Sequence, residues 1–183
     1  MDVIAEFEAL QERSSRLRDF DAGIHAKLRS VLGAQWQFEA DERKQEVLTQ
    51  RQRDWEMLRY FHESMANSGD LFGYLGMIYD DPKPFQVIGA TKTLKAANAL
   101  RVLYDQQQLL STQDEKDAFW HQSQEQRQPI ELEADSLHEF ADLLIAFAEA
   151  HPDEFSSVPA GDPFDNLNAY LSTLKEQIRE KKT

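Results

Sequence analysis

The chain contains no cysteine, and only 7 of its 183 residues are glycine and 6 are proline. Without thiols it cannot form a disulfide framework, a thiolate zinc site or a cysteine nucleophile, and this composition suits a reducing compartment. No stretch reaches the ~18 consecutive apolar residues of a membrane span. The first residues also lack the basic and apolar parts of a signal peptide. We therefore expect a cytoplasmic protein.

Length and composition favour one folded domain over residues 1–183. A chain of this length buries roughly 70% of its unfolded surface, and 41% of its residues are hydrophobic. The few Gly and Pro lie between segments with helical spacing of apolar residues, which predicts an all-α, single-domain bundle of about seven to eight helices. The sequence leaves open whether residues 1–40 form an N-terminal helical appendage. It also predicts a basic helical tail at 175–183.

Start and stop signals place the expected helices along the chain. Gly33 suits the left-handed residue that ends a helix, Asp70 suits the cap of a short helix, and Thr112 with Glu115 has capping-box spacing. Around Pro129, residues 127–134 indicate an extended linker in which a short strand fits. The expected helices are 3–20, 22–32, 41–65, 71–78, 84–107, one that begins after Ser111 or Thr112, 135–154, and 163–181.

Positive charge is missing from one long segment. The 47 residues from Gln128 to Leu174 hold no Lys or Arg but ten carboxylates, in a chain of net charge −13. A field of one sign this large repels nucleic acid and attracts basic surfaces. If residues 135–154 are helical, five carboxylates fall within one arc of roughly 80° opposite an apolar face. These five are Asp135, Glu139, Asp142, Glu149 and Asp153.

We expect this acidic segment to contact a basic surface of another protein. Carboxylates about 6 Å apart on a helix can occupy the positions of DNA phosphates, so DNA mimicry is one mode of binding. An acidic surface that only favours solubility is the alternative. Direct binding of nucleic acid is not expected, because the cations are few and the protein is acidic. The predicted contact residues are Glu131, Glu133, Asp135, Glu139, Asp142, Glu149, Asp153 and Glu154.

Motifs for catalysis or metal binding are missing from the chain. It has no phosphate-binding glycine loop and no Gly-x-Ser-x-Gly nucleophile elbow. Asp117 with His121 and Asp135 with His138 have helical spacing, but each pair supplies two ligands where a metal site needs three or four. We predict a protein with no catalytic residue, metal or cofactor. An enzyme that holds a divalent ion in an acidic pocket is the alternative.

Three stretches between residues 55 and 155, taken together, form a further pattern of apolar and turn residues. They contain Asn67, Gly69, Phe72 and Tyr74; then Ile88-Gly89-Ala90, Leu94, Ala97 and Leu100; and then Leu137, Leu143, Leu144, Phe147, His151, Glu154 and Phe155. The pattern resembles a bacterial family of all-helical domains whose studied member is a dimeric DNA-mimic protein, although Ser68 and Asp70 depart from it. The resemblance implies a homodimer that covers the DNA-binding surface of a transcription regulator.

Two other kinds of protein fit the same charge and composition. An immunity-type or antitoxin-like protein would also be small, acidic and catalytically silent, and it would neutralise a basic toxin. A helical interaction domain would instead bind through apolar surfaces, for which the helix with Gly89 and Ala90 is the candidate contact.

Overall fold

The computed structural model describes residues 3–156, without the side chains of residues 3–8 and 10. Every regular element in this part of the chain is helical, so the predicted all-α fold is confirmed. The helices predicted at 163–181 and 175–183 lie outside the described residues. The elements are α1 (Val3–Leu32), η1 (Trp36–Phe38), α2 (Asp41–Val47), α3 (Gln50–Ser68), η2 (Phe72–Tyr74), α4 (Leu75–Asp80), α5 (Lys83–Val87), α6 (Thr91–Gln108), α7 (Gln113–Gln122), α8 (Gln124–Glu131) and α9 (Leu137–Glu149), of which η1 and η2 are 3₁₀ helices.

The first helix, α1, is continuous over 30 residues, so the prediction of two helices is wrong. Asp21 stays inside the helix because its carboxylate has partners on α3. It accepts hydrogen bonds from Trp55 Nε1 and Arg59 Nη2, both at 2.9 Å. These distant partners replace the local backbone contacts through which an aspartate often ends a helix. Gly33 ends α1 as expected, with φ +87°.

The long helix predicted at 41–65 is interrupted at Leu48 and Thr49. Thr49 Oγ1 accepts a hydrogen bond from the backbone N–H of Gln52 (3.3 Å), and the Gln52 side chain accepts one from Thr49 N–H (3.1 Å). This capping box satisfies the first backbone donors of α3 and starts a new helix. Leu48, which is buried, fixes the bend. The new helix α3 ends at Gly69, with φ +65°.

The helix predicted at 84–107 is also divided, into α5 and α6. Gly89 has φ +80°, a left-handed conformation that a helix interior excludes and that glycine adopts at no steric cost. The next residue, Ala90, is fully buried. The turn therefore lets α6 begin at Thr91 in a new direction.

Residues 124–131 form α8, so the extended linker predicted at 127–134 is wrong as far as Glu131, and only residues 132–134 of it lie between α8 and α9. Proline removes one intrahelical hydrogen bond. Arg127 offsets that loss, because its Nε contacts Ser123 Oγ at 3.1 Å and its Nη1 contacts Glu131 Oε1 at 2.8 Å, one turn away on either side. The described residues also contain no strand.

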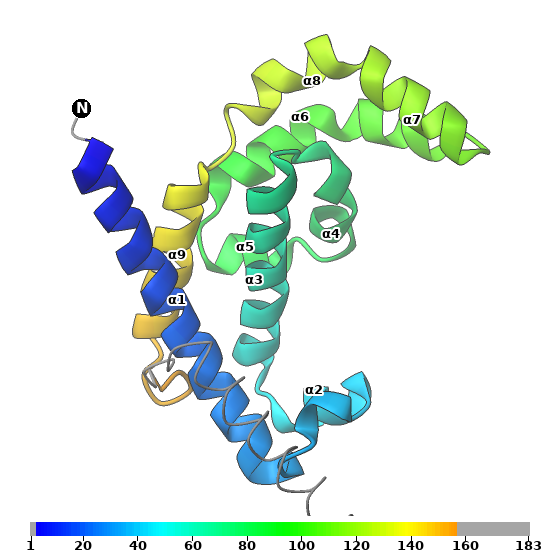
Figure 1. Ribbon diagram of the computed structural model, residues 1–183. Coiled ribbons are helices and arrows are strands. Elements are labelled where there is room, and N and C mark those ends of the chain that lie inside the picture. Colours follow the sequence, from blue (N-terminus) through cyan, green and yellow to red (C-terminus); the bar gives the residue numbers. More distant parts are fainter. Residues whose placement is uncertain (1–2, 157–183) are drawn as a thin grey trace, which may run out of the picture.

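The core lies where α9 packs against α1 and α3, which run side by side with it in Figure 1. Trp55 is fully buried, with its ring centroid 5.6 Å from that of Phe20 and 5.4 Å from that of Phe155. Farther along α3, Phe61 lies 5.3 Å from Phe140 of α9. Aromatic pairs at these separations stabilise a core beyond the area they bury.

The helices α7 and α8 and the second half of α6 project away from this core (Figure 1). We call this part, residues 100–131, the arm. Throughout the described part of the chain, no helix combines the length and the hydrophobicity that crossing a membrane requires.

Candidate partner-binding site

The predicted acidic helix is α9, and it is shorter than expected. Ser136 N-caps it through a capping box: Ser136 N–H donates to Glu139 Oε2 (2.9 Å), and Glu139 N–H donates to Ser136 Oγ (3.3 Å). Because α9 begins only after Ser136 and ends at Glu149, Asp135 and Asp153 lie outside it. The helical arc of five carboxylates is therefore wrong, and three of the five lie on α9.

The acids at the start of α9 contact α6. Asp135 Oδ2 accepts hydrogen bonds from the backbone N–H (2.9 Å) and the hydroxyl (2.8 Å) of Thr93, in the first turn of α6. Glu139 forms an ion pair with Lys92. That pair, together with the hydrogen bonds from Ser136, lowers the pKa of Glu139 to about 2.

The acids farther along α9 contact α1. Asp142 accepts two hydrogen bonds from Arg13, at 2.7 and 2.9 Å, in a two-point contact. Glu149 forms an ion pair with Arg16. All four side chains are partly exposed, so each pair contributes at most about 1 kcal/mol.

After α9 the chain turns onto α3. Glu154 contacts the hydroxyl of Thr49 and the guanidinium of Arg51, and these two contacts lower its pKa. Its backbone carbonyl accepts a hydrogen bond from Gln52 Nε2 at 2.6 Å. Asp153 beside it is exposed. Cations and donors on other elements thus hold most of the predicted acids, so these do not form one free row, and their contact with a partner stays a prediction.

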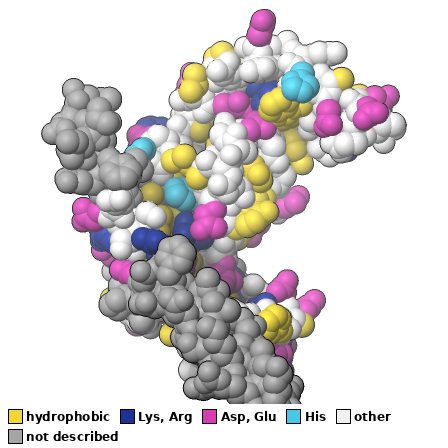
Figure 2. All heavy atoms as spheres, in the orientation of Figure 1, with side chains coloured by type: hydrophobic (Ala, Val, Ile, Leu, Met, Phe, Trp, Pro, Cys, Tyr) yellow, Lys and Arg dark blue, Asp and Glu magenta, His cyan; other side chains and the backbone are white. Residues whose placement is uncertain are grey.

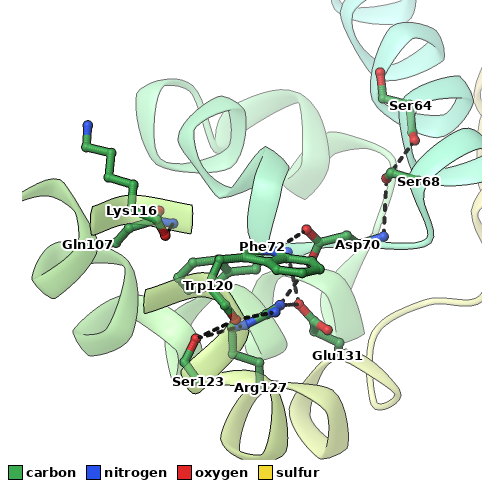
Figure 3. Close-up of polar contacts among 10 residues, drawn as sticks. All are labelled: Ser64, Ser68, Asp70, Phe72, Gln107, Lys116, Trp120, Ser123, Arg127 and Glu131. Carbon is green, nitrogen blue, oxygen red and sulfur yellow. Dashed lines mark hydrogen bonds and ion pairs between the residues drawn. The ribbon is translucent and has the colours of Figure 1, made fainter. Parts of the chain in front are cut away.

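Glu131 belongs to a buried cluster around Arg127 (Figure 3). The Arg127 side chain is 2% exposed, and its guanidinium lies 4.8 Å from the ring centroids of both Phe72 and Trp120. It forms ion pairs with Asp70 (3.1 Å) and Glu131 (2.8 Å). Burial, and then the hydrogen bond with Asp70, raise the pKa of Glu131.

The same cluster corrects the role predicted for Asp70. Its carboxylate caps no helix; Asp70 Oδ2 accepts a hydrogen bond from Trp120 Nε1 at 2.8 Å. Glu131 Oε1 also accepts one from the backbone N–H of Phe72, at 3.1 Å. Together these contacts fix the arm to the turn that follows α3.

Beside this cluster lies a hollow of about 280 Å³, between α3, the segment 132–136 and the first turns of α9. We call it the linker hollow. Glu131, Asp135 and His62 line it, and no Lys or Arg is among its described lining residues. Leu132, on its rim, is 79% exposed. Figure 2 shows hydrophobic side chains and a histidine on this face, where α3 and α9 lie in Figure 1. The apolar walls are Phe61, Met65, Leu71, Ala134, Leu137 and Phe140.

A second hollow, of about 260 Å³, lies on the other side of Leu137. His62 and Leu137 line both hollows, and His62 Nε2 contacts the Leu137 carbonyl oxygen at 3.1 Å. Burial lowers the pKa of His62. This hollow is lined by Arg13, Arg59 and Glu63. Both arginines form ion pairs, Arg13 with Asp142 and Arg59 with Glu63 and Asp21.

Within residues 3–156, no three His, Asp or Glu side chains lie close enough together to hold a metal ion. The pairs Asp117 with His121 and Asp135 with His138 gain no third ligand there.

Sequence reasoning missed the linker hollow and a set of acids on the arm. The hollow forms only when segment 132–136 folds over α3, although Ser136-x-x-Glu139 is a local signal for where α9 begins. On the arm, Asp114, Asp117 and Glu125 are exposed and form no ion pair with a described residue. Charge counts over longer segments hide these acids, because Lys92, Lys95 and Arg101 precede them in the chain.

Comparison of the chain with family models, curated proteins and solved structures found no match. The resemblance to the DNA-mimic family stays a prediction.

Proposed function

We propose that this protein performs no chemistry and binds a basic surface of another protein with the acids around the linker hollow. The observation that supports the proposal most is the charge of that hollow. Glu131 and Asp135 line it without any Lys or Arg among the described lining residues, and of these two only Glu131 is in an ion pair with a described residue, Arg127. The exposed Glu133 lies in the chain between two further lining residues, Leu132 and Ala134. A basic surface with apolar side chains complements this combination in charge and in hydrophobicity.

The ion pairs near the hollow are weak enough for a partner to replace. Glu133 lies 3.6 Å from Lys95, and the two side chains are 67% and 80% exposed. An exposed pair of this kind contributes between about 0 and 1 kcal/mol. A partner's cation can therefore take the place of Lys95 at little cost, which releases Lys95 to solvent.

Two classes of basic partner remain open, a DNA-binding regulator and a toxin. A regulator bound through its DNA-binding surface would be displaced by duplex DNA that carries its site. A toxin bound elsewhere would not be displaced. Competition with duplex DNA therefore separates DNA mimicry from toxin neutralisation.

The proposal is tested with the full chain immobilised and exposed to cell extract at low and high salt. Proteins released by salt are identified and purified, and their affinity is measured against two single variants that change charge equally. Glu133→Lys, beside the hollow, is expected to weaken binding about tenfold, because it replaces attraction with repulsion. The matched control Glu125→Lys, on the arm, is expected to change it less than threefold.

Three results would contradict the proposal. One is that no basic protein is retained in a salt-sensitive way. Another is that both variants bind as the unmodified chain does. The third is that Glu125→Lys weakens binding and Glu133→Lys does not, which would move the binding surface to the arm.

A further inference from the structure

We infer that the linker hollow receives one lysine or arginine side chain of the partner, with its methylene stem on the apolar walls and its cationic head at Asp135. The inference rests on the proposed function and extends it by naming the group that enters and the cavity that receives it.

The size and lining of the hollow suit one long side chain. Its volume of about 280 Å³ lies just below the roughly 300–1,000 Å³ of typical small-molecule sites. Phe61, Met65, Leu137 and Phe140 supply most of the apolar wall. Lysine and arginine cover apolar surface with their stems while the charged head stays at a polar edge. The hollow offers both surfaces within one opening.

Within residues 3–156, Asp135 has one carboxylate oxygen that is free to accept a hydrogen bond from a cation. Asp135 Oδ2 takes both hydrogen bonds from Thr93, which holds the carboxylate in place. Asp135 Oδ1 accepts no hydrogen bond from any residue in the described part of the chain. Glu131 lies beside it, but Arg127 at 2.8 Å balances its charge, so Asp135 is the carboxylate that would receive the cation. A positioned carboxylate of this kind forms the stronger, charge-assisted class of hydrogen bond with an ammonium or guanidinium.

The neighbouring groups favour this hollow over the one beyond Leu137. The carboxylate that lines that second hollow, Glu63, is already paired with Arg59 at 2.8 Å, whereas Asp135 keeps an oxygen without a hydrogen bond from any described residue. Leu132, which is 79% exposed at the rim of the linker hollow, offers apolar contact to a residue next to the entering cation. The partner segment is therefore one in which a basic residue has apolar neighbours.

The test uses the peptide acetyl-Leu-Lys-Leu-amide, titrated into the ¹⁵N-labelled full chain and followed by amide chemical shifts. Saturable shifts are expected at residues 132–137 and at Phe61 and Met65. The matched peptide acetyl-Leu-Gln-Leu-amide should bind about tenfold more weakly, because it lacks the charged hydrogen bond. Shifts confined to the arm, no shifts at all, or equal binding of the two peptides would overturn the inference.

Two further measurements sharpen the assignment. Ala134→Phe fills the hollow and should abolish the shifts at 132–137, whereas Ala118→Phe, exposed on the arm, should leave them unchanged. If Ala134→Phe does not fold, the peptide comparison decides alone. Spermidine tests for a free amine as the ligand. Equal or tighter spermidine binding with the same shifts would assign the hollow to a small polyamine and overturn the inference.

The two proposals can fail separately. Salt-sensitive retention of a basic protein that Glu133→Lys weakens, with peptide shifts away from the hollow, would leave the proposed function standing and remove this inference. Peptide shifts at the hollow with no retained basic protein would remove the proposed function and would show only that the hollow accepts a lysine side chain.

Discussion

At the scale of single residues, Arg127 is the side chain whose removal should cost the most stability. Arg127→Leu would remove a buried cation and leave the half-buried Asp70 and Glu131 without their counter-charge. We expect the free energy of unfolding, measured by urea denaturation, to fall by about 3–5 kcal/mol. Arg127→Lys should lower the free energy of unfolding by less, because it keeps the positive charge. It should still lower it, because lysine lacks the planar group that lies against Phe72 and Trp120.

Arg101 provides the control for this prediction. It also pairs with a carboxylate four residues away, Asp105, and lies over the Tyr79 ring, but its side chain is 52% exposed. Arg101→Leu should cost about 1 kcal/mol or less. An equal fall in the free energy of unfolding for Arg101→Leu and Arg127→Leu would contradict the prediction that burial makes the Arg127 ion pairs more important for stability.

Glu139 should make stability depend on pH in the acidic range. Lys92 and Ser136 lower its pKa from the ordinary 4.5 to about 2 in the folded protein. A carboxylate with a lowered folded-state pKa stabilises the fold above its unfolded pKa, and this contribution is lost as the pH falls from about 4.5 to about 2. Glu139→Gln keeps the cap and loses the ion pair. The urea midpoint of the unmodified chain should therefore exceed that of Glu139→Gln at pH 7, and the two should converge near pH 2.

Lys92→Gln removes the other partner and should show the same convergence. A midpoint difference that stays constant from pH 7 to pH 2, for either variant, would show that the ion pair is not its source.

At the scale of elements, the packing of the turn after α9 onto α1 depends on Gly23. A Cβ at this position would overlap the carbonyl oxygen of Ser156. Gly→Ala inside a helix normally stabilises by about 0.5–1 kcal/mol. Here we expect Gly23→Ala to lower the free energy of unfolding by about 1–3 kcal/mol, because the backbone of the turn must move. Thermal and urea unfolding measure the sign, and a more stable Gly23→Ala protein would contradict this packing.

Element boundaries could be predicted where their signals are local. The capping box of Thr112 and Glu115 is confirmed, as is the end of α1 at Gly33. The capping boxes at Thr49 and Ser136 are equally local signals for the starts of α3 and α9. The spacing of apolar residues alone instead predicts helices that run through both positions. The break at Gly89 depends on a left-handed φ that sequence does not specify, because glycine also occurs inside helices.

Contacts between distant residues could not be predicted. Asp21 meets Arg59, and Arg127 meets Asp70, over 38 and 57 residues of chain. No spacing rule links such pairs, so apolar spacing predicts a break before Ala22 and a linker from Arg127 where the structure has continuous helix. The candidate site was predictable as acidic. Its hollow was not, because the walls come from α3, the segment 132–136 and α9.

At the scale of the whole molecule, folding brings the separated charges of the sequence together. The acidic segment after Gln128 takes its counter-charges from α1, α3, α6 and α8, through Arg13, Arg16, Arg51, Lys92 and Arg127. Charge along the sequence therefore overstates the free negative charge on α9. What remains open to a partner is Asp135 at the linker hollow, the weakly paired Glu133, and the exposed acids of the arm. The homodimer implied by the family resemblance stays a prediction.

The most direct test of cation binding in the linker hollow removes the negative charge of Asp135 and changes little else. Asp135→Asn keeps an oxygen that can accept the hydrogen bonds of Thr93, so the fold and its melting temperature should not change. The dissociation constant of the Leu-Lys-Leu peptide, from the NMR titration, should rise about tenfold or more at low salt, because the charged hydrogen bond is lost. An unchanged dissociation constant in a folded Asp135→Asn protein would contradict this prediction.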